Sequence, residues 1–193
     1  MIRKSLGLSF AAAALAFASI AHAGYGDDRA LIEDLQARYL FAFDFGDAEG
    51  YAGTFAPDGI LDFGWGEIKG REKIAGFIAD GRKRTEEARS KTPAGQRPSV
   101  GRHIISNMVI KVEGKKAHAL AYWSHMTSGP DGRGGVDFFG HYEDELVKVN
   151  GEWLFARRRI YNESIAEWAS QYANPVKTPN PPPKYRAPSQ PQR

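Results

Sequence analysis

Apolar residues recur at helical spacing in the first half of the chain, and this spacing predicts helices. The predicted helices cover residues 27–45, 47–55 and 71–89. Asp27 or Asp28 can cap the first helix, and Gly46 can end it. Residues 82–89 are charged on every side, which indicates a solvated face rather than a binding surface. The inward-facing residues expected in the second and third helices are Tyr51, Phe55, Ile74, Phe77 and Ile78.

The second half of the chain alternates between apolar and polar residues, as strands do. The predicted strands are residues 102–112, 116–126, 136–149 and 152–161, after a short strand at residues 60–63. Gly114 and Asn150-Gly151 predict tight hairpins between the long strands. A turn is predicted before the short strand, at Pro57, Asp58 and Gly59. Helices followed by long antiparallel strands predict an α+β fold, with the helices packed on one face of a curved sheet.

The same alternation sorts the side chains of the long strands by sheet face. On the first two strands, the sets that share a face are His103, Ile105, Asn107 and Val109, then Ala119, Ala121, Trp123 and His125. On the third, Asp137, Phe139, His141 and Glu143 oppose Phe138, Gly140, Tyr142 and Asp144. On the fourth, Leu154, Ala156, Arg158 and Ile160 oppose Trp153, Phe155, Arg157 and Arg159. A bulge would exchange the two faces, and the pattern leaves open which face is concave.

The first 23 residues have the pattern of a cleaved signal peptide, which predicts a periplasmic or secreted protein. Arg3 and Lys4 precede an alanine-rich apolar run, and Ala21-His22-Ala23 fits a cleavage site. The run is short for a transmembrane anchor, so we expect no membrane contact after cleavage. Residues 24–165 are predicted to form one domain, and the proline-rich residues 166–193 an extended or disordered tail.

Charge and cysteine content exclude several classes of function. Without Arg3 and Lys4 the chain has 24 basic and 23 acidic residues, which gives no electrostatic reason to expect nucleic acid as a partner. Cysteine is absent from the sequence, and this excludes disulfides, thiolate metal sites and cysteine nucleophiles. Without disulfides, an exported domain depends on its core or on oligomerisation for stability.

The candidate chemistry lies where the first helix ends and the first long strand begins, at Asp44 and His103. A carboxylate that meets a histidine in an apolar pocket fixes the imidazole tautomer and steadies the imidazolium, which makes a general base. A metal site built from Asp44, His103, His125 and His141 is a weaker alternative, because no tight ligand spacing occurs.

The order of several short motifs resembles the SnoaL-like branch of the nuclear transport factor 2-like superfamily. The motifs are Tyr39-x4-Asp44-x2-Asp47, Phe55-x2-Asp58-Gly59, Gly70-Arg71-Glu72-x-Ile74, Arg102-His103-x3-Asn107, Gly140-x-Tyr142-x-Asp144 and Gly151-x-Trp153. The resemblance covers residues 27–163. It implies a cone-shaped barrel, in which a curved mixed or antiparallel sheet wraps around the N-terminal helices.

The resemblance also implies roles for particular residues. Members such as scytalone dehydratase, a bile-acid dehydratase and the hexachlorocyclohexane dehydrochlorinase use an Asp–His dyad that matches Asp44 and His103. Tyr39 and Arg158 match positions that line or assist the site, and His125 matches a second pocket histidine. The chain departs from scytalone dehydratase at Phe43 and Phe63, which match two tyrosines of that enzyme. The residues expected to form an apolar wall are Phe43, Phe55, Phe63, Trp65, Trp123 and Phe139.

These observations predict a cofactor-independent lyase or isomerase, similar to a dehydratase, that acts on a small hydrophobic cyclic molecule. Tyr39 and Arg158 would stabilise negative charge. His141 beside Glu143 is either a second acid–base group or a surface pair. The alternatives are a non-catalytic binding or interaction module and, less compatible with export, a dioxygenase small subunit. Aromatic residues expected on an exposed sheet face predict a homodimer or homotrimer; they are Tyr122, Trp153, Phe155 and Tyr161.

Overall fold

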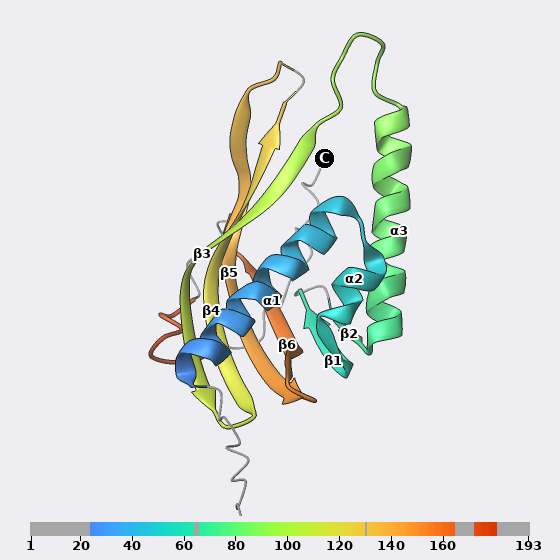
Figure 1. Cartoon of the computed structure of the whole chain (residues 1–193). Helices are drawn as coiled ribbons and strands as arrows, with labels where there is room; N and C mark the ends of the chain where they lie inside the picture. The colour runs from blue at the N-terminus through green and yellow to red at the C-terminus, as the bar shows by residue number, and fades with distance from the viewer. Residues whose placement is uncertain (1–23, 64–65, 130, 165–171, 181–193) are drawn as a thin grey trace, which may run out of the picture.

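The computed structural model describes residues 24–63, 66–129, 131–164 and 172–180. Its helices are α1 (Tyr25–Phe45), α2 (Ala48–Gly53) and α3 (Arg71–Ser90). Its strands are β1 (Phe55–Asp62), β2 (Glu67–Lys69), β3 (Val100–Glu113), β4 (Lys116–Ser128), β5 (Gly134–Val149) and β6 (Glu152–Asn162). Figure 1 shows α1 crossing one face of the sheet, with α2 and α3 beside it. The N-terminal segment predicted as a signal peptide lies outside the described residues.

The strands form one curved, open sheet in the order β2-β1-β6-β5-β4-β3. All neighbouring pairs are antiparallel except β1 and β6, which run parallel, so the sheet is mixed. The predicted α+β class, with a curved mixed sheet around the N-terminal helices, is confirmed (Figure 1). No helix in the described part of the chain is long and apolar enough to cross a membrane.

The predicted stop and hairpin signals are confirmed by the backbone geometry. Gly46 ends α1 in the left-handed region, with a φ of 68°. Asn150 and Gly151 join β5 to β6 with φ values of 51° and 91°, the positive values that a two-residue type I′ turn requires. The predicted cap of α1 is wrong, because the N-cap is Gly24. Asp28 is buried instead, and its carboxylate accepts hydrogen bonds from Lys148 and Trp153.

The predicted turn at Pro57-Asp58-Gly59 is also wrong, because these residues lie within β1. The register steps from Phe55 opposite Phe155 to Ile60 opposite Arg157. Four residues of β1 therefore face the single residue Ala156 of β6, which is a bulge rather than a reversal. The strong turn formers supply the backbone irregularity that the bulge needs, while the chain continues in the same direction.

Two further bulges change the face assignments that strict alternation predicts. On β3 the register shifts between Ser106 and Val109, and Asn107 has a φ of 52°. As a result Val109 is exposed while Ile110 is buried, so the predicted face holds only up to the bulge. On β6 the register against β5 shifts at Ala156.

The predicted exposed face of aromatic residues is therefore wrong for three of its four members. Trp153 and Phe155 turn inward before the β6 bulge and are buried in the core. Tyr161 does lie on the outer face, but residues 172–180 cover it: its ring contacts Tyr172 and its hydroxyl donates to the carbonyl of Asn180. Of the four, only Tyr122 is exposed, at 55%.

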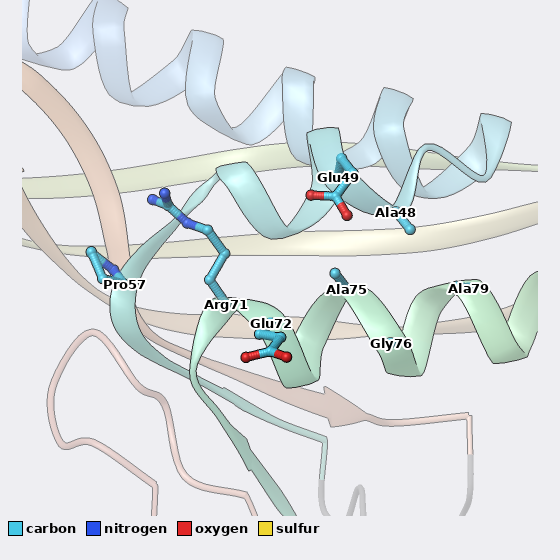
Figure 2. A pocket seen from close by; sticks show the side chains of 8 residues that line it. All are labelled: Ala48, Glu49, Pro57, Arg71, Glu72, Ala75, Gly76 and Ala79. Atoms are coloured by element: carbon cyan, nitrogen blue, oxygen red, sulfur yellow. The ribbon is translucent and has the colours of Figure 1, made fainter.

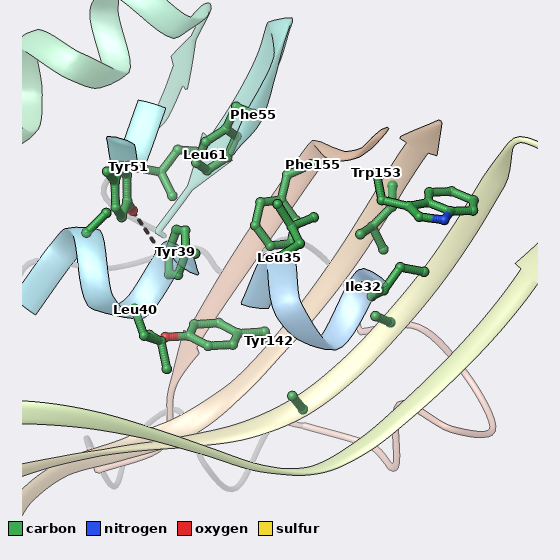
Figure 3. Packing of buried hydrophobic residues seen from close by; sticks show 14 of the residues in the cluster. Ile32, Leu35, Tyr39, Leu40, Tyr51, Phe55, Leu61, Tyr142, Trp153 and Phe155 are labelled. Atoms are coloured by element: carbon green, nitrogen blue, oxygen red, sulfur yellow. Dashed lines mark hydrogen bonds between the residues drawn. The ribbon is translucent and has the colours of Figure 1, made fainter. Parts of the chain in front are cut away.

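The core lies between α1 and the concave face of the sheet. Ile32, Leu35 and Tyr39 of α1 are completely or nearly completely buried against Trp153 and Phe155, as Figure 3 shows. Burying each large apolar side chain stabilises the fold by about 1.5–3 kcal/mol. The packing of α1 on the sheet therefore fixes where the C-terminal end of α1 meets the start of β3.

Candidate functional site

A cavity of about 250 Å³ lies among α1, α2, α3 and the concave face of the sheet. It is lined mostly by apolar and aromatic side chains, with one histidine: Tyr39, Leu40, Phe43, Tyr51, Leu61, Phe63, Phe77, His103, Trp123, Tyr142 and Ile160. A hollow of about 410 Å³, here called the vestibule, shares Phe43, Phe77 and His103 with this cavity. His103 therefore stands where the two spaces adjoin.

Asp44 and His103 form a tight pair at this position. The Nδ1 atom of His103 lies 2.6 Å from Oδ1 of Asp44, and the backbone N–H of His103 donates to Oδ2 at 2.9 Å. Because a carboxylate only accepts, Nδ1 carries the proton and Nε2 of the neutral ring is left as the free base. Both oxygens of Asp44 are used, so the end of α1 holds the ring of β3 in a fixed orientation.

Burial decides the charge of His103. It lowers the pKa of His103 below the usual value, and this effect outweighs the hydrogen bond and the charge of Asp44. The positive form of neighbouring His125 lowers the pKa of His103 further. The imidazole of His103 is therefore mainly neutral at neutral pH, which is the state that can accept a proton.

A second histidine–carboxylate pair lies beside the first. Nδ1 of His125 is 2.6 Å from Oδ1 of Asp137, and the rings of His125 and His103 are 4.6 Å apart between centroids. Strict alternation predicts Asp137 on the same face as Phe139, away from His125. A bulge in β5 makes Asp137 the extra residue between Val136 and Phe138, which turns it toward His125.

Tyr39 lines the inner part of the cavity. Its hydroxyl is 2.7 Å from that of Tyr51, as the dashed line in Figure 3 marks, and its ring contacts Tyr142 edge-on. Burial raises the pKa of Tyr39, so its phenol is protonated and can act as a hydrogen-bond donor. The hydroxyls of Tyr39 and Tyr51 carry two protons, and their mutual hydrogen bond uses one of them. The other proton can be donated to a bound molecule or to a further acceptor.

Arg158 does not line the cavity. Its side chain is 0% exposed, and it bonds Asp144 through Nε at 2.8 Å and through Nη2 at 2.7 Å. It also donates to Gln36, whose amide in turn donates to Asp144. Its guanidinium lies about 4 Å from the ring centroids of three aromatic residues: Tyr39 at 4.1 Å, Tyr142 at 4.0 Å and Phe155 at 4.1 Å. Arg158 thus lies beneath the tyrosines of the cavity, with its Nε and Nη2 donors bonded to protein partners and its Nη1 buried without one among the described residues.

Only part of the predicted apolar wall lines the cavity. Phe43, Phe63 and Trp123 line the cavity, and the ring of Phe43 meets His103 edge-on at 5.0 Å. Phe77, predicted as a buried helix residue, also lines it and stays 36% exposed. Phe55 belongs to the core beside the cavity, and Trp65 lies outside the described residues.

Phe139 and His141 are not among the lining residues, because they lie on the outer face of β5. Nδ1 of His141 lies 2.5 Å from Glu163, and its Nε2 lies 3.4 Å from Glu143. Asn180 donates two hydrogen bonds to Glu143 and covers it. The His141–Glu143 pair is therefore closed to a ligand. The four-residue metal set suggested by the sequence is thereby split between two faces. Within residues 24–63, 66–129, 131–164 and 172–180, no group of three or more His, Cys, Asp or Glu could hold a metal.

A different hollow, of about 600 Å³, lies between α2 and α3. Figure 2 shows Glu49 and Glu72 along it and Arg71 reaching away from the start of α3. The guanidinium of Arg71 donates to the carbonyl of Phe55, and Ala48, Ala75 and Ala79 supply only small side chains. Histidine is not among the described residues that line this hollow, so its only carboxylates, Glu49 and Glu72, have no imidazole partner there.

A curved open sheet, helices across its concave face and an apolar cavity with an inward histidine define a small α+β ligand-binding fold. Residues 26–159 match the SnoaL-like domain, and the chain belongs to this family. The family recognised from the short motifs in the sequence is thereby confirmed. The family includes polyketide cyclases and dehydratases. No curated protein shows significant sequence similarity to the chain.

Solved structures show the same fold. A protein from Catenulispora acidiphila in complex with S-DNPA is 28% identical, with a TM-score of 0.57, over 71% of this chain and 92% of that one. An NTF2-like protein with a cystatin-like fold from Novosphingobium aromaticivorans is 24% identical, with a TM-score of 0.59, over 74% and 87%. A putative scytalone dehydratase from the same organism is 22% identical, with a TM-score of 0.54, over 70% and 83%.

Proposed function

We propose that the protein is a cofactor-independent lyase or isomerase, similar to a dehydratase, with His103 as general base. The observation that carries the proposal is the Asp44–His103 pair, 2.6 Å apart, at the edge of an apolar cavity. Two further facts support it: burial keeps His103 neutral, and the family includes dehydratases and cyclases. General acid–base groups positioned in this way contribute about 10²–10⁴-fold to a rate.

In the proposed reaction, Nε2 of His103 removes a proton from a carbon next to a carbonyl group. The negative charge of Asp44 stabilises the imidazolium that forms, and its two hydrogen bonds keep the ring in place. The imidazolium of His103 then returns this proton to carbon at a new position, or gives it to a leaving hydroxyl that departs as water. His125, oriented by Asp137, lies beside His103 at a ring-centroid distance of 4.6 Å. The phenol of Tyr39 donates to the oxygen on which negative charge develops.

The predicted role of Arg158 as an anion clamp is replaced here by an indirect one. Its guanidinium is paired with Asp144 and packed on the rings of Tyr39 and Tyr142. The positive charge lowers the pKa of the Tyr39 phenol against the opposing effect of burial. Arg158 thus positions and polarises Tyr39 and does not itself contact the substrate.

The cavity size and lining support a small, largely apolar cyclic substrate. Ligand pockets have volumes of about 300–1,000 Å³, and the cavity of about 250 Å³ lies just below this range, which suits a small ligand. Aromatic side chains make up more than half of its lining, and they offer flat faces to a ring system.

The test is proton exchange at carbon, which reports the first step without requiring the complete reaction. We would incubate the protein in D₂O with small cyclic ketones, such as 2-tetralone and 4-chromanone, and follow loss of the α-proton by NMR. We expect exchange with wild type and little with His103→Gln or Asp44→Asn. His118→Gln is the matched control, because His118 is exposed at the far end of β4. Circular dichroism and melting temperature would show that the variants are folded.

The alternative is a non-catalytic binding module of the same fold. It predicts that cyclic ketones bind, as seen by quenching of tryptophan fluorescence, while their α-protons exchange at the buffer rate. Exchange that persists in His103→Gln would also overturn the proposed role of this residue, because another group would then be the base.

We also propose that the mature protein is exported and forms a homodimer or homotrimer. Arg3, Lys4 and the alanine-rich run that follows support export. Exposed apolar side chains on the outer faces of β3, β4 and β5 support self-association; they are Ile104, Val109, Tyr122 and Phe139. Fractionation of a periplasmic extract and light scattering of the purified protein would test the two proposals.

A further inference from the structure

The vestibule is the space through which the Asp44–His103 pair faces outward. It lies between the C-terminal half of α3, the end of α1 and the beginning of β3. Figure 1 shows these elements at one end of the molecule, where α3 stands across from the start of β3. The vestibule and the apolar cavity adjoin at Phe43, Phe77 and His103, which line both spaces.

Three arginines line the vestibule, and they are Arg82, Arg89 and Arg102. The acidic residues that line it are Glu86 and Asp44, and both oxygens of Asp44 already accept hydrogen bonds from His103. The other titratable groups facing this space are His103 and His125. Three arginines against two carboxylates leave a small positive excess at the rim when both histidines are counted as neutral, although the whole chain is close to neutral after removal of the predicted signal peptide.

The three arginines are not equivalent. Arg82 donates to the carbonyls of Phe45 and Gly46, so part of its charge compensates the negative end of the α1 dipole. Arg102 lies over the ring of Phe45, at 4.5 Å from the centroid, which holds its guanidinium at the rim. In the part of the chain that the structure describes, neither Arg89 nor Arg102 forms an ion pair with a carboxylate.

We propose that the vestibule binds a carboxylate on the same molecule whose ring occupies the apolar cavity. The substrate class is then a cyclic acid: an apolar ring beside His103 and an anionic arm that reaches Arg89 and Arg102. Guanidinium groups suit carboxylates because they donate several hydrogen bonds in one plane. This proposal rests on the proposed function, because it takes the cavity as the place of the ring.

The sequence alone favoured a solvated face for residues 82–89. The fold brings one side of that helix opposite Arg102, which is too far along the chain for a sequence pattern to connect. The charges therefore converge on the entrance of a ligand cavity instead of spreading over an isolated helix surface.

The test compares two probes that differ only in charge, 2-naphthoate and 2-naphthamide, by isothermal titration calorimetry at neutral pH. We expect wild type to bind the anion more tightly than the amide. Arg89→Gln and Arg102→Gln should each weaken binding of 2-naphthoate about two- to fivefold, which is the range of a partly exposed charged contact. The affinity for 2-naphthamide should not change. Raising the salt concentration should reduce the preference, because exposed charges are screened.

Arg84→Gln is the matched control, because Arg84 is on the same helix and has the same charge but does not line the vestibule. It should leave both affinities unchanged. The proposal would be overturned if wild type bound the two probes equally, or if Arg84→Gln and Arg89→Gln lost the same affinity for 2-naphthoate. Either result would leave the cavity as the ligand site. Binding of neither probe would overturn the proposed ligand cavity itself.

Discussion

Removing the Arg158 side chain should cost the protein a large part of its folding stability. In Arg158→Met, the carboxylate of Asp144 stays fully buried but loses both of its hydrogen bonds to the guanidinium. Gln36 remains as its one side-chain donor in the described part of the chain, at 2.7 Å. Breaking a buried ion pair by removing one partner costs about 3–5 kcal/mol. The whole domain is expected to be stable by about 5–15 kcal/mol, so the variant loses at least about a fifth of its folding stability.

The assay is urea unfolding followed by tryptophan fluorescence and circular dichroism, together with the melting temperature. A loss of this size lowers the melting temperature of a domain of this length by about 6–20 °C. Replacing the whole polar group, in Arg158→Met/Asp144→Leu/Gln36→Leu, should recover most of the loss, because no buried charge or amide then lacks a partner.

A loss below about 1 kcal/mol in Arg158→Met would refute the expected cost, because water or another group would then pair with Asp144. A triple variant less stable than Arg158→Met alone would refute it as well. A variant of normal stability with no ligand binding would instead assign Arg158 to the binding machinery.

Four other substitutions have definite expected results. An imidazole titration by NMR should give His103 a pKa below the usual value of 6.5. Asp44→Asn should lower this pKa further, because the carboxylate favours the charged ring. A pKa above 6.5 in wild type would contradict the effect of burial. Since the folded state disfavours protonated His103, stability should fall as pH drops from 6.5 through the lowered pKa, and His103→Gln should weaken this pH dependence. Gly101→Ala should displace His125, because a Cβ atom there would overlap Nε2 of the ring, so chemical shifts of His125 should change while the protein stays folded. Gly140→Ala should destabilise the sheet by at least about 2 kcal/mol in urea unfolding, since its Cβ atom would overlap a backbone carbonyl of β6 that cannot move alone.

The helices, hairpins and fold class could be predicted because they depend on local signals. Gly46 and Asn150-Gly151 set the backbone at their own positions, and the spacing of Leu35 and Tyr39 is enough to show which side of α1 is buried. The pairing of Asp44 with His103 came from resemblance to a family, since nothing local connects residues 59 positions apart.

The wrong face assignments have one physical origin, which is that strand alternation is reset at each bulge. Asn107 tolerates a positive φ, and Asp137 follows a glycine-rich loop, but neither residue type marks a bulge on its own. One extra residue exchanges the faces, so Val109 and Asp137 each moved to the side opposite the predicted one. The depth of Arg158 was missed for a different reason: its partner Asp144 and the packing of aromatic rings around it depend on tertiary structure.

The residues beneath the cavity tolerate substitution less well than the residues at its entrance. The Arg158–Asp144 pair lies beneath Tyr39 and Tyr142, whereas Phe43 and Phe77 sit partly exposed at the entrance. Substitutions of these partly exposed side chains can alter the shape of the cavity at little cost in folding, and they leave the buried Arg158–Asp144 pair in place. A lineage with this architecture can therefore exchange one ligand for another through few mutations, each of which is viable on its own.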